Sequence, residues 1–124
     1  MSDSQEKLPE FENSLSLLKG ASAKTLYKAL VNQLSKDFAR ANIPFSFREE
    51  ITPEELLSTL KEKLYVLLLE NFSDYLNLMY IIDVPESAFK NLELTDAVEV
   101  AEQLSFLILR REWQKVWLKA HYRS

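Results

Sequence analysis

The amino-acid sequence predicts an all-α protein, an up-and-down bundle of three to four helices in which two long helices run antiparallel. The 124 residues include one glycine and four prolines, so helix breakers are rare and long segments run uninterrupted. Each of these segments repeats its apolar residues with helical spacing. Only one short stretch, around Phe45 and Phe47, alternates as a strand would, and it has no second strand to pair with.

Length and composition predict one domain over residues 1–124, with residues 1–8 as a flexible tail. Apolar residues make up 47% of the chain and charged residues 27%, which is typical of a soluble globular protein. The absence of cysteine excludes disulfides, thiolate metal sites and cysteine nucleophiles. The acidic N-terminus does not resemble a signal peptide, and polar residues interrupt the apolar region 64–84, so we expect a cytoplasmic protein without a membrane span.

Two short helices are predicted in the first third of the chain. The first covers about Pro9–Lys19, because proline suits a first helical position and Gly20 then lies just past the end. The second follows Ser22 as N-cap and ends before Pro44. Its apolar residues repeat every four positions: Leu26, Leu30, Leu34 and Phe38. The rings of Phe45 and Phe47 are expected to insert into the core.

The third predicted helix has the strongest start signal in the sequence and runs to about Ile82. Thr52 can cap it, Pro53 occupies the first position, and Glu55 can complete a capping box. Its apolar residues cover more than half of the circumference, so we expect a central helix with neighbours on two sides. Asn71 falls in the middle of this apolar arc and is expected to be a buried amide with hydrogen-bond partners.

The last predicted helix, capped by Thr95 and ending near His121, changes its apolar side halfway along. The first half places one set of residues on one face: Ala97, Val100, Ala101, Leu104, Leu107 and Ile108. The pattern then requires apolar residues at 111 and 115, where the chain has Arg111 and Lys115. A second face is built by Phe106, Leu109, Trp113, Val116, Trp117 and Ala120.

The second face allows three interpretations. It can pack inside the protein, against the first helix or the Phe45–Phe47 stretch. It can bind a protein, because tryptophan and arginine are enriched at binding hot spots. It can also hold nucleic acid or an anionic membrane surface, since residues 106–124 carry a net charge of +4. Residues 1–105, with 10 Lys/Arg and 18 Asp/Glu, carry −8, which argues against a general nucleic-acid binder.

No motif in the sequence indicates catalysis, a cofactor or a metal. Glycine-rich nucleotide loops and the G-x-S-x-G pattern are missing. Glu70 and Asp74 share a predicted helix face. A carboxylate-bridged metal pair in a helical bundle, however, requires a Glu-x-x-His motif on each of two helices, and the single histidine, His121, lies near the C-terminus. A ligand pocket or an enzyme site is an alternative, which we would place among the following residues: Tyr65, Asn71, Tyr75 and Tyr80.

These observations predict a non-catalytic protein–protein interaction or adaptor protein. Its partner would be another protein or a second copy, giving a homodimer. The candidate partner-binding residues are Phe106, Leu109, Arg110, Trp113, Val116, Trp117 and Ala120. The alternatives are a small-ligand-binding protein or enzyme with a pocket between helices, and a nucleic-acid binder that uses the basic C-terminal helix. The preferred site requires that Trp113 and Trp117 are exposed in the monomer.

Overall fold

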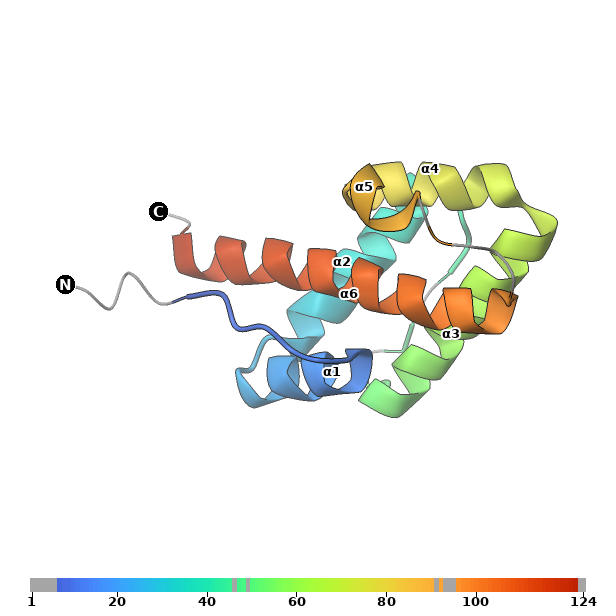
Figure 1. The fold of residues 1–124 in the computed structure, drawn as a ribbon. Helices are drawn as coiled ribbons and strands as arrows, with labels where there is room; N and C mark the ends of the chain where they lie inside the picture. The colour runs from blue at the N-terminus through green and yellow to red at the C-terminus, as the bar shows by residue number, and fades with distance from the viewer. Residues whose placement is uncertain (1–6, 46, 49, 91, 93–95, 123–124) are drawn as a thin grey trace.

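The computed structural model describes residues 7–45, 47–48, 50–90, 92 and 96–122, and these residues form six α-helices and no strand (Figure 1). The all-α class predicted from the sequence is therefore confirmed. The helices are α1 (Ser14–Ala23), α2 (Tyr27–Arg40), α3 (Pro53–Glu70), α4 (Phe72–Ile82), α5 (Glu86–Phe89) and α6 (Ala97–Tyr122).

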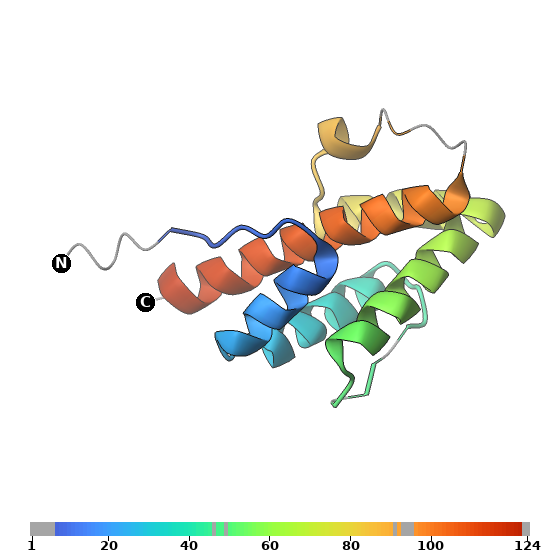
Figure 2. The same cartoon turned by 60° about the horizontal axis from the view of Figure 1, so that its bottom comes forward.

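Helix α6 is the central element of the fold. It packs against α1, α2, α3 and α4, and its buried residues lie on both of the faces that the sequence distinguishes. Figures 1 and 2 show it crossing the other helices along most of its length, with its C-terminal half beside the N-terminal segment. We predicted this central role for a single helix over 53–82, but that segment forms two helices, α3 and α4, and α6 is the helix that contacts α1, α2, α3 and α4.

The interruption is at Asn71, which ends α3 and precedes α4. The backbone of Asn71 is not helical, with φ −152° and ψ 67°, so the helix cannot continue through it. The Asn71 side chain is exposed, and the predicted buried amide is therefore also wrong. Because α3 is shortened and crosses α6 obliquely (Figure 2), the predicted arrangement of two long antiparallel helices is not confirmed.

The start of α3 matches the sequence prediction in detail. Thr52 accepts a hydrogen bond from the backbone N–H of Glu55, and the Glu55 carboxylate accepts one from the backbone N–H of Thr52. The capping box is therefore confirmed, with Pro53 at the first helical position. The Tyr27 hydroxyl donates to the carbonyl oxygen of Ile51 at 2.6 Å, and this bond ties α2 to the same helix start.

The structure describes part of the start of α6 and part of the stretch around Phe45 and Phe47. Thr95, the predicted cap of the last helix, lies outside the described residues. The carboxylate of Asp96 accepts hydrogen bonds from the backbone N–H groups of Val98 and Glu99, as an N-cap side chain does. The rings of Phe45 and Phe47 pack against the core as predicted, with centroids 4.5 Å apart.

The boundaries of α1 and α2 differ from the prediction. Helix α1 begins at Ser14, because the side chain of Asn13 caps it by accepting from the backbone N–H of Ser16 at 2.9 Å. Pro9 therefore lies in a non-helical segment, which we name the N-terminal strap (residues 8–12). Ser22 is part of α1 and does not cap α2, which begins at Tyr27.

Gly20 does not end α1 but lies inside it, and its function is to admit an aromatic ring. A methyl group at this position would overlap the Cε1 and Cζ atoms of the Phe11 ring. The ring is held on its other side by Trp113, at a centroid distance of 6.0 Å in an edge-on arrangement. The missing side chain therefore lets the strap approach α1 closely.

We expect Gly20→Ala to lower the free energy of unfolding by about 1–2 kcal/mol, because the added methyl displaces Phe11 from its site. The same change in a Phe11→Ala background removes the overlap and should raise stability by up to ~1 kcal/mol through helix propensity. Urea unfolding of the four variants of this cycle measures both effects. If Gly20→Ala instead stabilises the otherwise wild-type protein, the Phe11 ring does not require the absence of a side chain at residue 20.

Candidate interaction site

The two tryptophans of the predicted interaction face are buried in the monomer. Trp113 is 1% exposed and Trp117 is 2% exposed. The indole N–H of Trp113 donates to the carbonyl oxygen of Pro9 at 3.0 Å, and the ring of Trp117 stacks on His121 at 3.6 Å. The prediction that these side chains are exposed is therefore wrong. The first interpretation, packing inside the protein against the N-terminal region, describes their position.

The other predicted partner-binding residues do not form one surface either. Leu109 and Val116 are buried, and Phe106 is half-buried. Arg110 and Ala120 are exposed, but the residues that would join them are buried. The apolar side chains that α6 exposes near its end are instead Leu118 and Tyr122.

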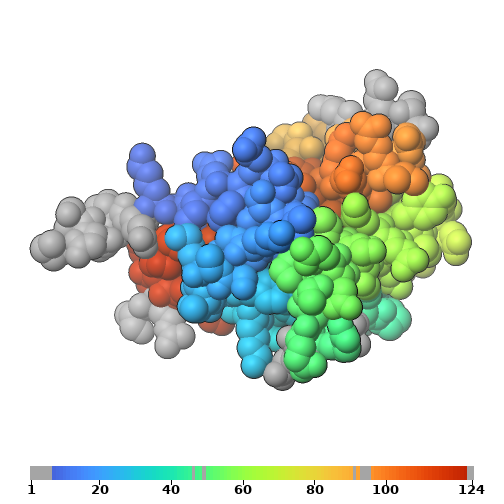
Figure 3. Space-filling view, turned by 90° about the horizontal axis from the view of Figure 1, so that it is seen from below, coloured from blue at the N-terminus to red at the C-terminus, as the bar shows by residue number. Residues whose placement is uncertain are grey.

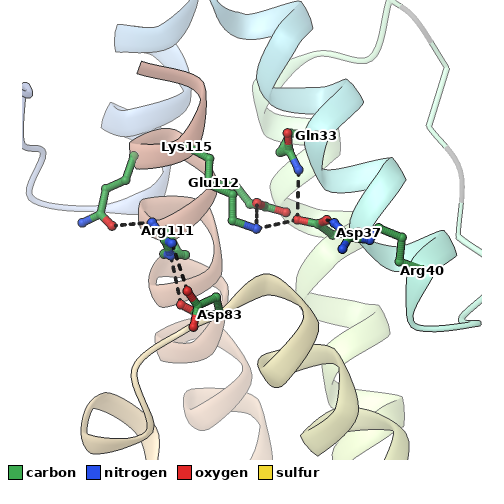
Figure 4. A network of polar contacts seen from close by, with 8 residues as sticks. Gln33, Asp37, Arg40, Asp83, Arg111, Glu112 and Lys115 are labelled. Atoms are coloured by element: carbon green, nitrogen blue, oxygen red, sulfur yellow. Dashed lines mark hydrogen bonds and ion pairs between the residues drawn. The ribbon is translucent and has the colours of Figure 1, made fainter. Parts of the chain in front are cut away.

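The change of side on α6 results from two basic residues that bind other helices. The guanidinium of Arg111 donates to Asp83, to its carbonyl oxygen at 2.9 Å and to its carboxylate at 3.1 Å (Figure 4). Asp83 ends α4 in the left-handed conformation, with φ 71°, which leaves this carbonyl free to accept. Arg111 thus joins α6 to the C-terminus of α4.

The second basic residue, Lys115, lies between two buried carboxyl groups. Its Nζ atom is 2.7 Å from Oδ2 of Asp37 on α2 and 3.1 Å from Oε1 of Glu112, one turn earlier on α6 (Figure 4). Both carboxyl groups are fully buried. Gln33 and Arg40 also donate to Asp37, at 3.2 Å and 3.4 Å. This cluster replaces the apolar residue that the pattern requires at 115.

The two carboxyl groups of the cluster differ in protonation. Burial opposes the ionisation of Asp37, but hydrogen bonds from Glu112, Lys115 and Gln33 and the charge of Lys115 outweigh it, and its pKa is below the usual value. Burial, with the hydrogen bond and the charge of Asp37, raises the pKa of Glu112 to about 9. At neutral pH the cluster therefore holds one carboxylate, one neutral carboxyl and one ammonium.

This cluster is a structural tie between α2 and α6 and not an accessible reaction site. Paired carboxyl groups with separated pKa values are typical of acid–base catalysis. A substrate would have to reach Asp37 or Glu112, however, and neither side chain has exposed surface. Within the described part of the chain, no three His, Cys, Asp or Glu side chains are grouped as a metal site would require.

The residues that we proposed for an alternative ligand pocket do not line a common cavity. Tyr65, Asn71 and Tyr80 are exposed, whereas Tyr75 is buried. Glu70 and Asp74 no longer share one helix, because α3 ends at Glu70.

Two surfaces of opposite charge remain unpartnered. The first, which we name the α3–α4 face, exposes Tyr65, Val66, Leu69 and Phe72, with Leu69 58% exposed and Phe72 43% exposed. Its carboxylates are Glu62, Glu70 and Asp74, and none of them forms an ion pair with the described residues. Tyr65, Leu69 and Phe72 were predicted to belong to the apolar arc over 53–82, and they are exposed.

The second surface, the α2–α6 groove, has a volume of about 360 Å³. Its lining includes Ala29, Gln33, Lys36, Val116, Lys119 and Ala120. Lys36 and Lys119 are exposed and form no ion pair with the described residues. Val116 and Ala120 belong to the predicted partner-binding set, and both line the groove, Ala120 as an exposed residue and Val116 as a buried one. Figure 3 shows the end of α6 (red) and the α3–α4 corner (green to yellow-green) on opposite sides of the molecule.

Comparison with protein-family models, with curated proteins and with solved structures finds no match for this chain. Among the described helices, none combines the length and apolar character needed to cross a membrane. The functional argument therefore rests on the two surfaces themselves.

Glu112→Gln should flatten the pH dependence of stability between about pH 5 and pH 9. Above its usual pKa of 4.5 the unfolded chain releases this proton, while the folded state keeps it up to about pH 9. Raising the pH therefore favours unfolding, by at most about 1.4 kcal/mol per pH unit. The stabilising contribution of Glu112 is complete below pH 4.5 and is lost as the pH approaches 9.

Urea titrations of wild type, Glu112→Gln and the exposed-site control Glu99→Gln at each pH measure this effect. Asp37 does not obscure it, because the contribution of a lowered pKa is already complete above its usual value of 3.8. A Glu112→Gln curve that stays parallel to the control across this range would show that Glu112 is ionised in the fold.

Proposed function

We propose that this protein is a non-catalytic interaction protein whose contact surface is the α3–α4 face. The observation that carries the proposal is the exposure of apolar side chains on adjacent turns of α3 and the first turn of α4. Tyr65 and Leu69 stand one helical turn apart, and Phe72 follows directly after the break. Contiguous apolar surface on a monomer marks interaction sites more often than scattered apolar residues do.

The charges around this face indicate the kind of partner. Glu62 and Glu70 frame Val66 along the solvent side of α3, and Asp74 lies on the first turn of α4. Because these carboxylates have no cation within the described residues, lysine or arginine from a partner can approach them without breaking an existing pair. A basic segment with apolar residues at helical spacing fits this arrangement.

The polar groups of the core support a non-catalytic function. The carboxyl groups with shifted pKa values, Asp37 and Glu112, are enclosed between α2 and α6, away from the exposed face. The charge of the Asp37 carboxylate is balanced by Lys115 inside the same cluster, and Glu112 is neutral at neutral pH. They stabilise the scaffold that presents the surface, whereas the surface itself carries carboxylates and apolar groups.

Leu69→Glu should abolish partner binding, because it places a charge at the most exposed apolar position of the face. The tagged wild-type protein and this variant are used to capture proteins from cells, with quantitative comparison of the captured species. We expect a loss of at least about 2 kcal/mol, or roughly thirtyfold in affinity, for a hot-spot residue. The matched control is Val98→Glu, an equally apolar and exposed position on α6 outside this face.

As a control, circular dichroism of both variants tests whether they keep the helical fold. If the same proteins are captured at equal levels by wild type and Leu69→Glu, the α3–α4 face is not the contact surface.

A further inference from the structure

We infer that the partner of the α3–α4 face is the α2–α6 groove of a second copy of this chain, so that the protein associates with itself head to tail. This inference rests on the proposed function, because it names the occupant of the same face. The α3–α4 face and the α2–α6 groove are complementary in shape and in charge, and both properties support the inference.

The groove can receive the apolar side chains of the face. Ala29 and Ala120 are small and exposed, so two helix backbones can approach closely at this point, and Val116 forms an apolar floor between them. The groove, with a volume of about 360 Å³, is open to solvent, and the α3–α4 corner, which carries the exposed Leu69 and Phe72, lies on the other side of the molecule (Figure 3). Insertion of these two side chains would remove apolar surface from water on both copies.

The charges of the two surfaces are opposite and unsatisfied. Lys36 and Lys119 stand at the groove, and Glu70 and Asp74 stand beside the exposed apolar side chains of the face. None of these four groups has an ion-pair partner among the described residues. A single contact between two copies would supply a counter-charge to all of them, and one of the two groove cations, Lys119, belongs to the basic segment 106–124 with its net charge of +4.

The position of the two surfaces determines the symmetry of the assembly. The groove lies where α2 approaches the C-terminal half of α6, and the face lies at the α3–α4 corner on the other side (Figures 1 and 3). Because the two surfaces lie on opposite sides of the molecule, two copies cannot form both contacts at once, and a dimer formed this way leaves one face and one groove free. The association therefore continues to a ring or an open chain instead of stopping at a twofold dimer.

Sedimentation velocity of the full chain over a wide dilution series, at low and high salt, tests this symmetry. We expect the mass to rise with concentration beyond that of a dimer and to fall when salt screens the ion pairs. A monomer at every concentration, or a dimer that never grows, would overturn the inference.

Charge reversal tests the pairing itself. Glu70→Lys and Lys119→Glu, each alone, should weaken self-association at least about tenfold, because each places like charges across the contact. An equimolar mixture of the two variants should restore it, since the reversed face then meets the reversed groove. Glu86→Lys and Lys90→Glu, exposed on or beside α5, are the matched controls and should behave as wild type.

Failure of the mixture to restore association would overturn the inference, as would equal behaviour of the variants and their controls. These results are separable from the proposed function. If the protein is monomeric but Leu69→Glu still reduces the capture of other proteins, the α3–α4 face binds a different partner. If Leu69→Glu changes neither capture nor mass, both proposals are wrong.

Discussion

The contacts of Lys115 with the carboxylate of Asp37 and with the neutral carboxyl of Glu112 are the interaction on which the arrangement of α6 depends. A helix packed on most of its circumference must place some polar side chains inside, and each buried charge requires a partner. Lys115 pairs with the Asp37 carboxylate on α2 and lies beside the neutral carboxyl of Glu112 on its own helix, so the two charges of this cluster compensate each other. With Arg111 bound to the end of α4, these contacts fix the rotation of α6, and its tryptophans consequently turn toward α1 and the N-terminal strap.

Local signals in the sequence predicted those parts of the fold that depend on neighbouring residues. The all-α class and the capping box at Thr52 follow from spacing within a few positions, and both are confirmed. The break at Asn71 was not predicted, because the apolar spacing continues through it and Asn lowers helix propensity only slightly. The start of α1 was misplaced because Pro9 and Asn13 are both acceptable near a helix start, and only the packing of Phe11 against Gly20 decides between them.

The candidate site shows where patterns of polarity mislead. The basic residues that interrupt the apolar stripe at 111 and 115 do have a structural role. They bind Asp83 and Asp37 inside the protein, and they do not mark a surface for a partner. Asp37 gave a second signal, since it falls on the apolar stripe of α2 next to Phe38, and pairing it with Lys115 would have required knowledge of which helices are neighbours. Conversely, the apolar band containing Leu69 looked like core and is exposed, because no helix covers that side of α3.

The bond between Trp113 and Pro9 joins residues 104 positions apart, and this separation has a consequence for biosynthesis. Helix α6 supplies neighbours to α1, α2, α3 and α4, yet it leaves the ribosome after all of them. Until it emerges, Phe11 lacks its indole partner and Asp37 lacks the Lys115 ammonium, so the nascent helices expose apolar surface and Asp37 keeps only its contacts with Gln33 and Arg40 on α2. Completion of this core is therefore coupled to the synthesis of α6, and a stall before residue 115 would leave a chain that chaperones must protect.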